Sequence, residues 1–204
     1  MKTILITGAN GFLGTALKNK LKDQATVIGI DIDDVNIAKE DEVEDYVAYL
    51  ASTGITLNGL INNAAISYKG LNITNEQFEK TLQTNIIGTH NCIKHFRNIM
   101  VKDSSIVNIG SIYGSLSPDP KIYKNDATQY NSCAYGSSKA ALTQMTKYYA
   151  VHYAPEIRVN MVSPGGIFNN QSKEFVKAYN DTNKSNANTS FMYITYFFML
   201  LMRV

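Results

Sequence analysis

The sequence has few cysteines. Only two occur in 204 residues, Cys92 and Cys133, and they lie far apart with no metal-ligand pattern around them. This spacing excludes a disulfide framework or a cysteine-based zinc site as the basis of the fold. We expect both thiols to be buried in a protein of a reducing compartment. No other metal site is expected either, because His90, His95 and His152 lie in helical segments without a ligand partner.

A strong charge of either sign is also missing. The 19 basic and 17 acidic residues leave a formal charge of +2, and they are spread along the chain without a basic block. Nucleic acid is therefore not expected as a partner. The chain is long enough for one domain with a substantial core. We expect this domain at residues 1–180, followed by an atypical tail at residues 181–204, first polar and then apolar.

A long apolar run is absent near the first residue. The run after Lys2 lasts three or four residues before the glycines begin at Gly8, which is too short for the core of a secretory signal peptide. This favours a cytoplasmic protein, with no membrane partner expected.

Short apolar segments alternate with segments of helical periodicity. The expected strands cover residues 3–8, 25–31, 57–65, 104–111 and 157–166, and the expected helices cover residues 12–22, 40–51, a pair from about 75, and 132–153. Such alternation predicts parallel strands with helices on both faces. We therefore predict an α/β fold with a doubly wound parallel sheet of about six strands. Ligands of such sheets bind outside the carboxyl ends of the strands.

The stretch GANGFLG follows the first expected strand and leads into a helix. In this G-x-x-G-x-x-G pattern Gly8 allows a tight turn, Gly11 lets a pyrophosphate approach the backbone, and Gly14 lets the helix pack closely. The helix N-terminus presents free N–H groups to the phosphates. The expected cofactor contacts are Gly8, Asn10, Gly11, Phe12 and Leu13.

Asp31 ends the second expected strand. A carboxylate at this place accepts hydrogen bonds from a ribose hydroxyl and repels a 2′-phosphate, which favours NAD over NADP. The alternative is an ordinary acidic residue at the start of a loop, since Asp33 and Asp34 follow.

Further short motifs stand in order after the glycine loop. They are Asn62-Asn63-Ala64-Ala65, Asn85, Ser111, Tyr135-x-x-x-Lys139 and Pro164-Gly165. A tyrosine four residues before a lysine is weak evidence of a catalytic pair by itself. Together with the glycine loop, however, the whole set of motifs resembles the short-chain dehydrogenase/reductase family over about residues 2–168. The resemblance implies a Rossmann fold and an NAD(P) cofactor. It adds cofactor contacts at Asn63, Ala64, Tyr135, Lys139, Pro164 and Ile167.

The resemblance also implies the chemistry, the interconversion of a secondary alcohol and a carbonyl. Tyr135 would be the general acid and base, and Lys139, on the same helix face, would lower its pKa together with the charge of the oxidised cofactor. Ser111 would position the substrate oxygen, and Asn85 would hold a water that links Lys139 to solvent. For Ser111 and Asn85 the alternatives are ordinary capping or turn roles.

The sequence departs from the family in three places inside the expected domain. Almost no room separates Asp31 from the helix at Glu40, so a crossover element is shortened or missing. The segment between Ser111 and Tyr135 is about ten residues longer than usual. This insert resembles that of bacterial members linked to flagellin modification or surface-sugar synthesis. Its Tyr113, Tyr123 and Lys124 would contact a polar small-molecule substrate. The alternative is that the insert is a surface loop without a role in the site.

The glycine pattern matches members that act on nucleotide sugars, which keeps an epimerase or dehydratase with tightly bound NAD as an alternative.

The last residues also depart from the family. Residues 182–190 have the composition of a linker, and the 14 apolar and aromatic residues after them are too short to span a bilayer comfortably. A truncated or frameshifted relative, a membrane-surface anchor and a replacement strand are the competing interpretations. The first leaves open a catalytically inactive nucleotide-binding protein. The family suggests a homodimer or homotetramer.

Overall fold

A computed structural model describes residues 1–124 and 126–183, so the expectations for the tail lie almost wholly outside the described residues. Five strands of the described chain form one sheet in the order β2-β1-β3-β4-β5, and each neighbouring pair is parallel. The strands are β1 (Thr3–Thr7), β2 (Thr26–Ile30), β3 (Leu57–Asn62), β4 (Met100–Ile109) and β5 (Ile157–Val162). The predicted doubly wound α/β fold is confirmed, with five strands described where we expected about six.

The short link after β2 explains the smaller sheet. The chain passes from β2 to helix α2 (Glu40–Ser52) through turns alone, so no further helix and strand are added beyond β2. β2 is consequently an edge strand, next to β1. Because β2 and β3 lie on opposite sides of β1, the direction of winding reverses at β1. Ligands of open α/β sheets bind at this kind of reversal.

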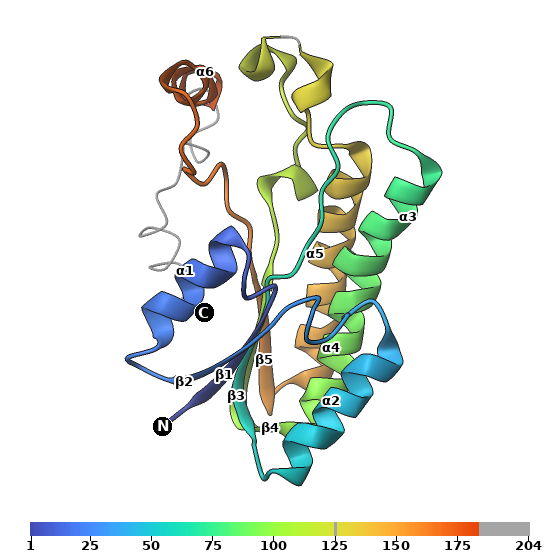
Figure 1. The fold of residues 1–204 in the computed structure, drawn as a ribbon, viewed down its shortest axis with the longest axis vertical. Coiled ribbons are helices and arrows are strands. Elements are labelled where there is room, and N and C mark those ends of the chain that lie inside the picture. Colours follow the sequence, from blue (N-terminus) through green and yellow to red (C-terminus); the bar gives the residue numbers. More distant parts are fainter. Residues whose placement is uncertain (125, 184–204) are drawn as a thin grey trace.

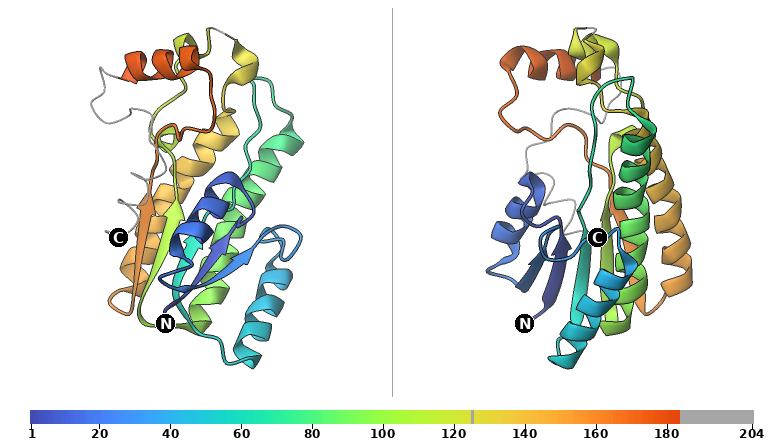
Figure 2. Two further views of the ribbon diagram at one scale, coloured as in Figure 1. Left: turned by 60° about the vertical axis from the view of Figure 1, so that its left-hand side comes forward. Right: turned by 45° about the vertical axis from the view of Figure 1, so that its right-hand side comes forward.

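Helices cover both faces of the sheet (Figures 1 and 2). Helix α1 (Phe12–Leu21) lies on one face, and α2, α4 (Thr89–Phe96) and α5 (Cys133–Tyr153) lie on the other. Helix α3 (Asn75–Leu82) runs into α4 through a π-helical segment, η1 (Gln83–Gly88). A 3-10 turn, η2 (Arg97–Ile99), then connects α4 to β4.

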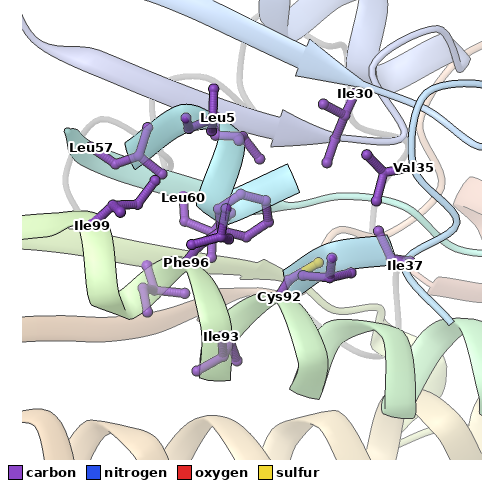
Figure 3. Packing of buried hydrophobic residues seen from close by; sticks show 14 of the residues in the cluster. Leu5, Ile30, Val35, Ile37, Leu57, Leu60, Cys92, Ile93, Phe96 and Ile99 are labelled. Atoms are coloured by element: carbon purple, nitrogen blue, oxygen red, sulfur yellow. The ribbon is translucent and has the colours of Figure 1, made fainter. Parts of the chain in front are cut away.

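Each face has its own hydrophobic core. On the larger one, Cys92, Ile93 and Phe96 of α4 are fully buried against the sheet, where they meet Leu5 and Leu60 (Figure 3). The smaller core joins α1 to the opposite face through Leu17 and Leu21. The expectation of two buried cysteines is correct for Cys92 and wrong for Cys133, which is exposed. Cys133 is the first residue of α5 and lines a surface cavity instead of facing the sheet.

The insert and helix α6 (Lys173–Asn183) lie together beyond the carboxyl ends of the strands (Figure 1). The insert consists mainly of three 3-10 turns, η3 (Ile112–Gly114), η4 (Pro120–Tyr123) and η5 (Ala127–Gln129). The rings of Tyr123 and Phe175 pack with their centres 5.5 Å apart, which ties the insert to α6. The two segments therefore form one cover over this end of the sheet. Among the described helices, none has the length and apolar character needed to cross a membrane.

Candidate active site

Two cavities lie at the carboxyl ends of the strands. The first has a volume of about 440 Å³, within the size range of small-molecule and cofactor sites. Seven of the expected cofactor residues line it: Gly8, Gly11, Phe12, Leu13, Asp31, Asn63 and Ala64. The sequence did not single out several apolar members of its wall, among them Ile32, Val35 and Ile37.

The three glycines of the loop serve different needs. Gly8 has φ +63°, and a Cβ there would lie 2.7 Å from the Cα of Ala64. A Cβ at Gly14 would lie 2.1 Å from the carbonyl oxygen of Gly8. At Gly11 the nearest atom to such a Cβ is 3.4 Å away, an ordinary contact, and Gly11 lines the cavity. The chain's own packing thus requires Gly8 and Gly14, whereas a side chain at Gly11 would fill space that a ligand could use.

Asn63 ties the glycine loop to the end of β3. Its Nδ2 donates to the carbonyl oxygens of Thr7 at 3.0 Å and Gly8 at 2.9 Å. In return, Thr7 Oγ1 accepts hydrogen bonds from the backbone N–H groups of Asn63 and Ala64. This reciprocal set of bonds fixes the loop in the shape that leaves the cavity open.

The carboxylate of Asp31 is held at the edge of the first cavity. Its Oδ2 accepts a hydrogen bond from the backbone N–H of Asn10 at 2.8 Å, and its Oδ1 accepts one from Ile32 at 2.8 Å. Each oxygen keeps a lone pair for a further donor, as a ribose hydroxyl would be. Asn10 does not line the cavity, and its side chain accepts a hydrogen bond from Lys18 Nζ.

The second cavity, of about 600 Å³, contains Ser111 and Tyr135. Burial raises the pKa of the Tyr135 phenol, and the Ser111 hydroxyl lies near enough to that of Tyr135 to oppose this rise. Ser111 Oγ accepts a hydrogen bond from the backbone N–H of Tyr113 at 3.1 Å, so it caps the first turn of the insert. Ser111 therefore both caps this turn and lines the cavity.

Lys139 lies one helical turn after Tyr135 but does not line either cavity. Only 3% of it is exposed, and its Nζ donates to the carbonyl oxygen of Ile109 at 2.7 Å. The Nζ stands 5.7 Å from the centre of the Tyr135 ring. Burial without a carboxylate partner lowers the pKa of Lys139 to about 8.

The expected fall in the pKa of Tyr135 is not present in the protein alone. Burial raises this pKa, because the phenolate loses hydration, and the nearby Ser111 hydroxyl opposes the rise only in part. Lys139 directs its ammonium to a backbone carbonyl, and no hydrogen bond joins it to the phenol oxygen in the described structure. At neutral pH Tyr135 is therefore a protonated hydroxyl.

Asn85 lies in the π-helical segment and is almost completely buried. Its Nδ2 donates to the carbonyl oxygen of Ile66 and to Ser138 Oγ, and its Oδ1 accepts from the backbone N–H of Ile66. Ser138 precedes Lys139 and donates to the carbonyl oxygen of Tyr135. Asn85 thus connects the segment after β3 to the helix turn that carries Tyr135 and Lys139. Its expected part in a water relay stays a prediction.

Two residues after β5 that we expected to contact the cofactor do not line the first cavity. Ile167 lines the second cavity, not the first. Pro164 lines neither, and its carbonyl oxygen accepts a hydrogen bond from the backbone N–H of Ile112 at 3.1 Å. Pro164 therefore anchors the start of the insert beside Ser111.

Tyr113, Tyr123 and Lys124 line the second cavity, together with residues that sequence reasoning missed, and their contact with a substrate stays a prediction. The missed polar and aromatic residues are Lys69, Gln129, Asn131, Gln171, Ser172, Phe175 and Tyr179. Lys69 and Asn131 pair as an isolated antiparallel bridge between the loop after β3 and the end of the insert. No spacing pattern signals contacts between segments so far apart in the sequence.

Comparison with known proteins identifies the family. A family model described as enoyl-(acyl carrier protein) reductase matches residues 9–193. An oxidoreductase of Schizosaccharomyces pombe, itself uncharacterised, is 30% identical over 200 residues, which cover 88% of this chain and 72% of that protein. The chain belongs to the short-chain dehydrogenase/reductase family. It is an oxidoreductase of this family, as the resemblance implied.

Other members of the short-chain dehydrogenase/reductase family agree in fold and sequence. A short-chain dehydrogenase of Leptospira borgpetersenii, solved with bound NAD⁺, is 30% identical, with a TM-score of 0.75, and the match covers 87% of this chain and 76% of that one. Carbonyl reductase family member 4 of Danio rerio is 34% identical over 134 residues, 64% of this chain and 52% of that protein. The chain spans between about half and three quarters of the length of these relatives. The finer resemblance to flagellin-modifying or surface-sugar members stays a prediction.

Proposed function

We propose that this short-chain dehydrogenase/reductase interconverts a secondary alcohol and a carbonyl with NAD, using Tyr135 as the proton donor and acceptor. The observation that carries the proposal is that Ser111 and Tyr135 line the same cavity at the carboxyl ends of the strands, with their hydroxyls near each other. The first cavity lies at the same edge of the sheet, with an open glycine loop and a carboxylate. Small-molecule sites combine a few directed polar groups with an accessible cavity in this way.

In the direction of reduction, the Tyr135 hydroxyl gives its proton to the carbonyl oxygen, and Ser111 donates a hydrogen bond to the same oxygen. Because burial raises the pKa of Tyr135, the protonated form is ready at neutral pH. In the direction of oxidation the phenol must first lose this proton. Oxidation is therefore expected to gain from alkaline pH, and reduction is not.

Lys139 supports the phenolate that remains after proton transfer. Its buried ammonium near the Tyr135 ring has no carboxylate among its hydrogen-bond partners in the described structure, so its positive charge is available to the phenolate. Asn85 acts through Ser138 and fixes the position of this helix turn. Asn85 is thus a positioning residue in this proposal, while Tyr135 and Ser111 touch the substrate.

The first cavity fits an adenine dinucleotide. Gly11 leaves room for a phosphate beside the N-terminus of α1, and Asp31 offers acceptors to ribose hydroxyls. The Asp31 carboxylate would repel a 2′-phosphate, which favours NAD over NADP. NAD would supply the hydride for reduction or accept it in oxidation. The NAD⁺ bound to the 30% identical Leptospira protein supports this choice.

We also propose the remaining assignments that the sequence suggested. Residues 1–180 would act as one nucleotide-binding and catalytic domain. The chain would work in the cytoplasm as a homodimer or homotetramer.

Hydride transfer tests the proposed function. NADH carrying deuterium at the reactive carbon would be supplied with a panel of ketones, and each product alcohol analysed by mass spectrometry. We expect deuterium on the carbinol carbon of at least one product. Purified protein that retains NAD and changes a substrate without net consumption of NADH would instead favour the epimerase or dehydratase alternative.

A further inference from the structure

We propose that the substrate carries an anionic group, a carboxylate or a phosphate, and that Lys69 binds this group in the cavity of Tyr135 and Ser111. The inference rests on the proposed function, because it names the class of substrate for the same site. It depends on the charges around the cavity, on the hydrogen bonds of Lys69 and on the backbone that holds it.

The charged residues that line the cavity have one sign. Lys69 and Lys124 both belong to its wall, and no aspartate or glutamate is found among the described residues that line it. The other polar members are neutral amides and hydroxyls. Tyr113 and Tyr123 join their hydroxyls at 3.0 Å, and burial with this bond raises the pKa of Tyr113, so it stays uncharged. The cavity is therefore suited to a polar ligand with a negative charge.

The side chain of Lys69 is held by a neutral partner. Its Nζ donates to Asn131 Oδ1, which also accepts a hydrogen bond from Ser67 Oγ at 3.1 Å. A lysine ammonium has three N–H donors, so this bond leaves two for a ligand. Partial desolvation of the ammonium also lowers the pKa of Lys69. An anion in the cavity would offset this loss of hydration, which the Asn131 amide does only in part.

The connection between the two loops does not require a lysine side chain. The backbone N–H of Gly70 donates to Tyr130 at 2.8 Å, and that of Ser132 donates to Tyr68 at 3.1 Å. These bonds flank the bridge of Lys69 with Asn131 and hold the loop after β3 against the end of the insert. The ammonium is thus carried on a fixed backbone, and as an exposed residue Lys69 can be reached by a ligand.

Lys124 is the weaker candidate for the same charge. It lies at the end of η4 with φ +52°. The pKa of the Glu174 carboxyl is lowered mainly by hydrogen bonds from its own backbone N–H and from Ser172, and the charge of Lys124 adds to this effect. Part of its charge is therefore balanced within the protein. We expect Lys69 to dominate the recognition and Lys124 to add a smaller contribution.

Two pairs of ketones that differ in charge test the inference. Acetoacetate would be compared with ethyl acetoacetate, and dihydroxyacetone phosphate with dihydroxyacetone, by kcat/KM for NADH oxidation. We expect the wild type to prefer the anionic member of at least one pair about tenfold. The pair that shows the preference distinguishes a carboxylate from a phosphate. Lys69→Gln should abolish the preference by lowering kcat/KM for the anionic member alone.

Lys121→Gln is the matched control. It removes the same charge from the insert, which forms part of the wall of the cavity, but Lys121 itself does not line the cavity, so the preference should persist. Equal kcat/KM within both pairs for the wild type would overturn the inference and leave the proposed function standing. An equal loss for charged and neutral substrates in Lys69→Gln would also overturn it, because a merely structural role has that effect.

If no probe is turned over, the binding of the anionic probes tests the inference instead. The melting temperature would be measured with saturating NADH and each probe in turn. A rise with an anionic probe that Lys69→Gln loses and Lys121→Gln keeps supports the inference. The same rise in all three proteins, or no rise with either anionic probe, overturns it. Binding of an anionic ketone without turnover would count against the proposed function and not against the charge preference.

Discussion

Ser111 and Tyr135 line the same cavity, with their hydroxyls near each other, although the whole insert separates them in the sequence. Ser111 follows β4, and Tyr135 lies in the first turn of α5. The insert leaves and returns at neighbouring points, and it is fastened at its start by Pro164 and at its end by the bridge of Lys69 with Asn131. Its length therefore does not disturb the pair, and it adds a wall to the cavity instead.

The glycine loop gives a prediction in which stability and binding separate. Gly11→Ala should keep the wild-type melting temperature but weaken NADH binding at least about tenfold, because the new methyl group occupies the ligand space. Gly8→Ala should instead lower the free energy of unfolding by about 2 kcal/mol or more, since φ +63° and the contact with Ala64 both oppose a side chain. Chemical denaturation and NADH titration measure the two effects.

The NADH titration is informative only if the wild type binds NADH. NADH must raise the melting temperature of the wild type, as any ligand that binds only the folded state does. If it does not, the catalytically inactive alternative is favoured. Unchanged NADH affinity in Gly11→Ala would contradict the assignment of the first cavity.

Asp31 should decide the choice of cofactor. Asp31→Asn keeps an oxygen that can accept hydrogen bonds from Asn10 or Ile32, but it removes the charge that repels a 2′-phosphate. We expect the preference for NADH over NADPH, measured as the ratio of kcat/KM values, to fall about tenfold. Asp33→Asn serves as the control, since Asp33 does not line the cavity. An unchanged ratio in Asp31→Asn would show that another residue selects the cofactor.

Lys139 links the site to the pH dependence of stability. The folded protein holds the Lys139 proton only up to about pH 8, whereas the ordinary pKa is 10.5. The unfolded chain therefore binds more protons between these values, and the stability of the wild type rises with pH in this window. The charged form costs the folded state about 3 kcal/mol below pH 8.

Lys139→Met should accordingly unfold no more easily than the wild type at about pH 7, even though it loses the bond to Ile109, worth about 1 kcal/mol. The free energy of unfolding of the wild type should gain about 2 kcal/mol relative to that of Lys139→Met between about pH 7 and about pH 9.5. Urea unfolding at the two pH values measures this difference, with Lys147→Met on the exposed side of the same helix as control. A constant difference across this range would mean that Lys139 titrates as an ordinary lysine.

Much of the fold could be predicted from local patterns. The strand and helix alternation, the glycine loop and the short link after Asp31 are all features of contiguous sequence, and the structure has them within a few residues of the predicted bounds. The sequence also predicted that one edge of the sheet carries Gly8, Asp31, Asn63 and Ser111, because parallel strands bring their carboxyl ends together.

Features that depend on distant contacts could not be predicted in this way. The bridge of Lys69 with Asn131 and the packing of α6 on the insert need the folded chain. The exposure of Cys133 and the raised pKa of Tyr135 likewise depend on what surrounds each group. Sequence order can place a residue at an edge of the sheet, but it does not state what that residue touches.

Replacement of Tyr135 by phenylalanine tests the central claim most directly. Tyr135→Phe removes the proton donor and keeps the ring, whereas Tyr130→Phe removes a hydroxyl from a tyrosine that does not line the cavity. NADH-dependent ketone reduction and NADH affinity would be measured for both variants beside the wild type. We predict that Tyr135→Phe loses at least about a hundredfold in turnover with unchanged NADH affinity, and that Tyr130→Phe keeps both. Wild-type turnover in Tyr135→Phe would contradict the account.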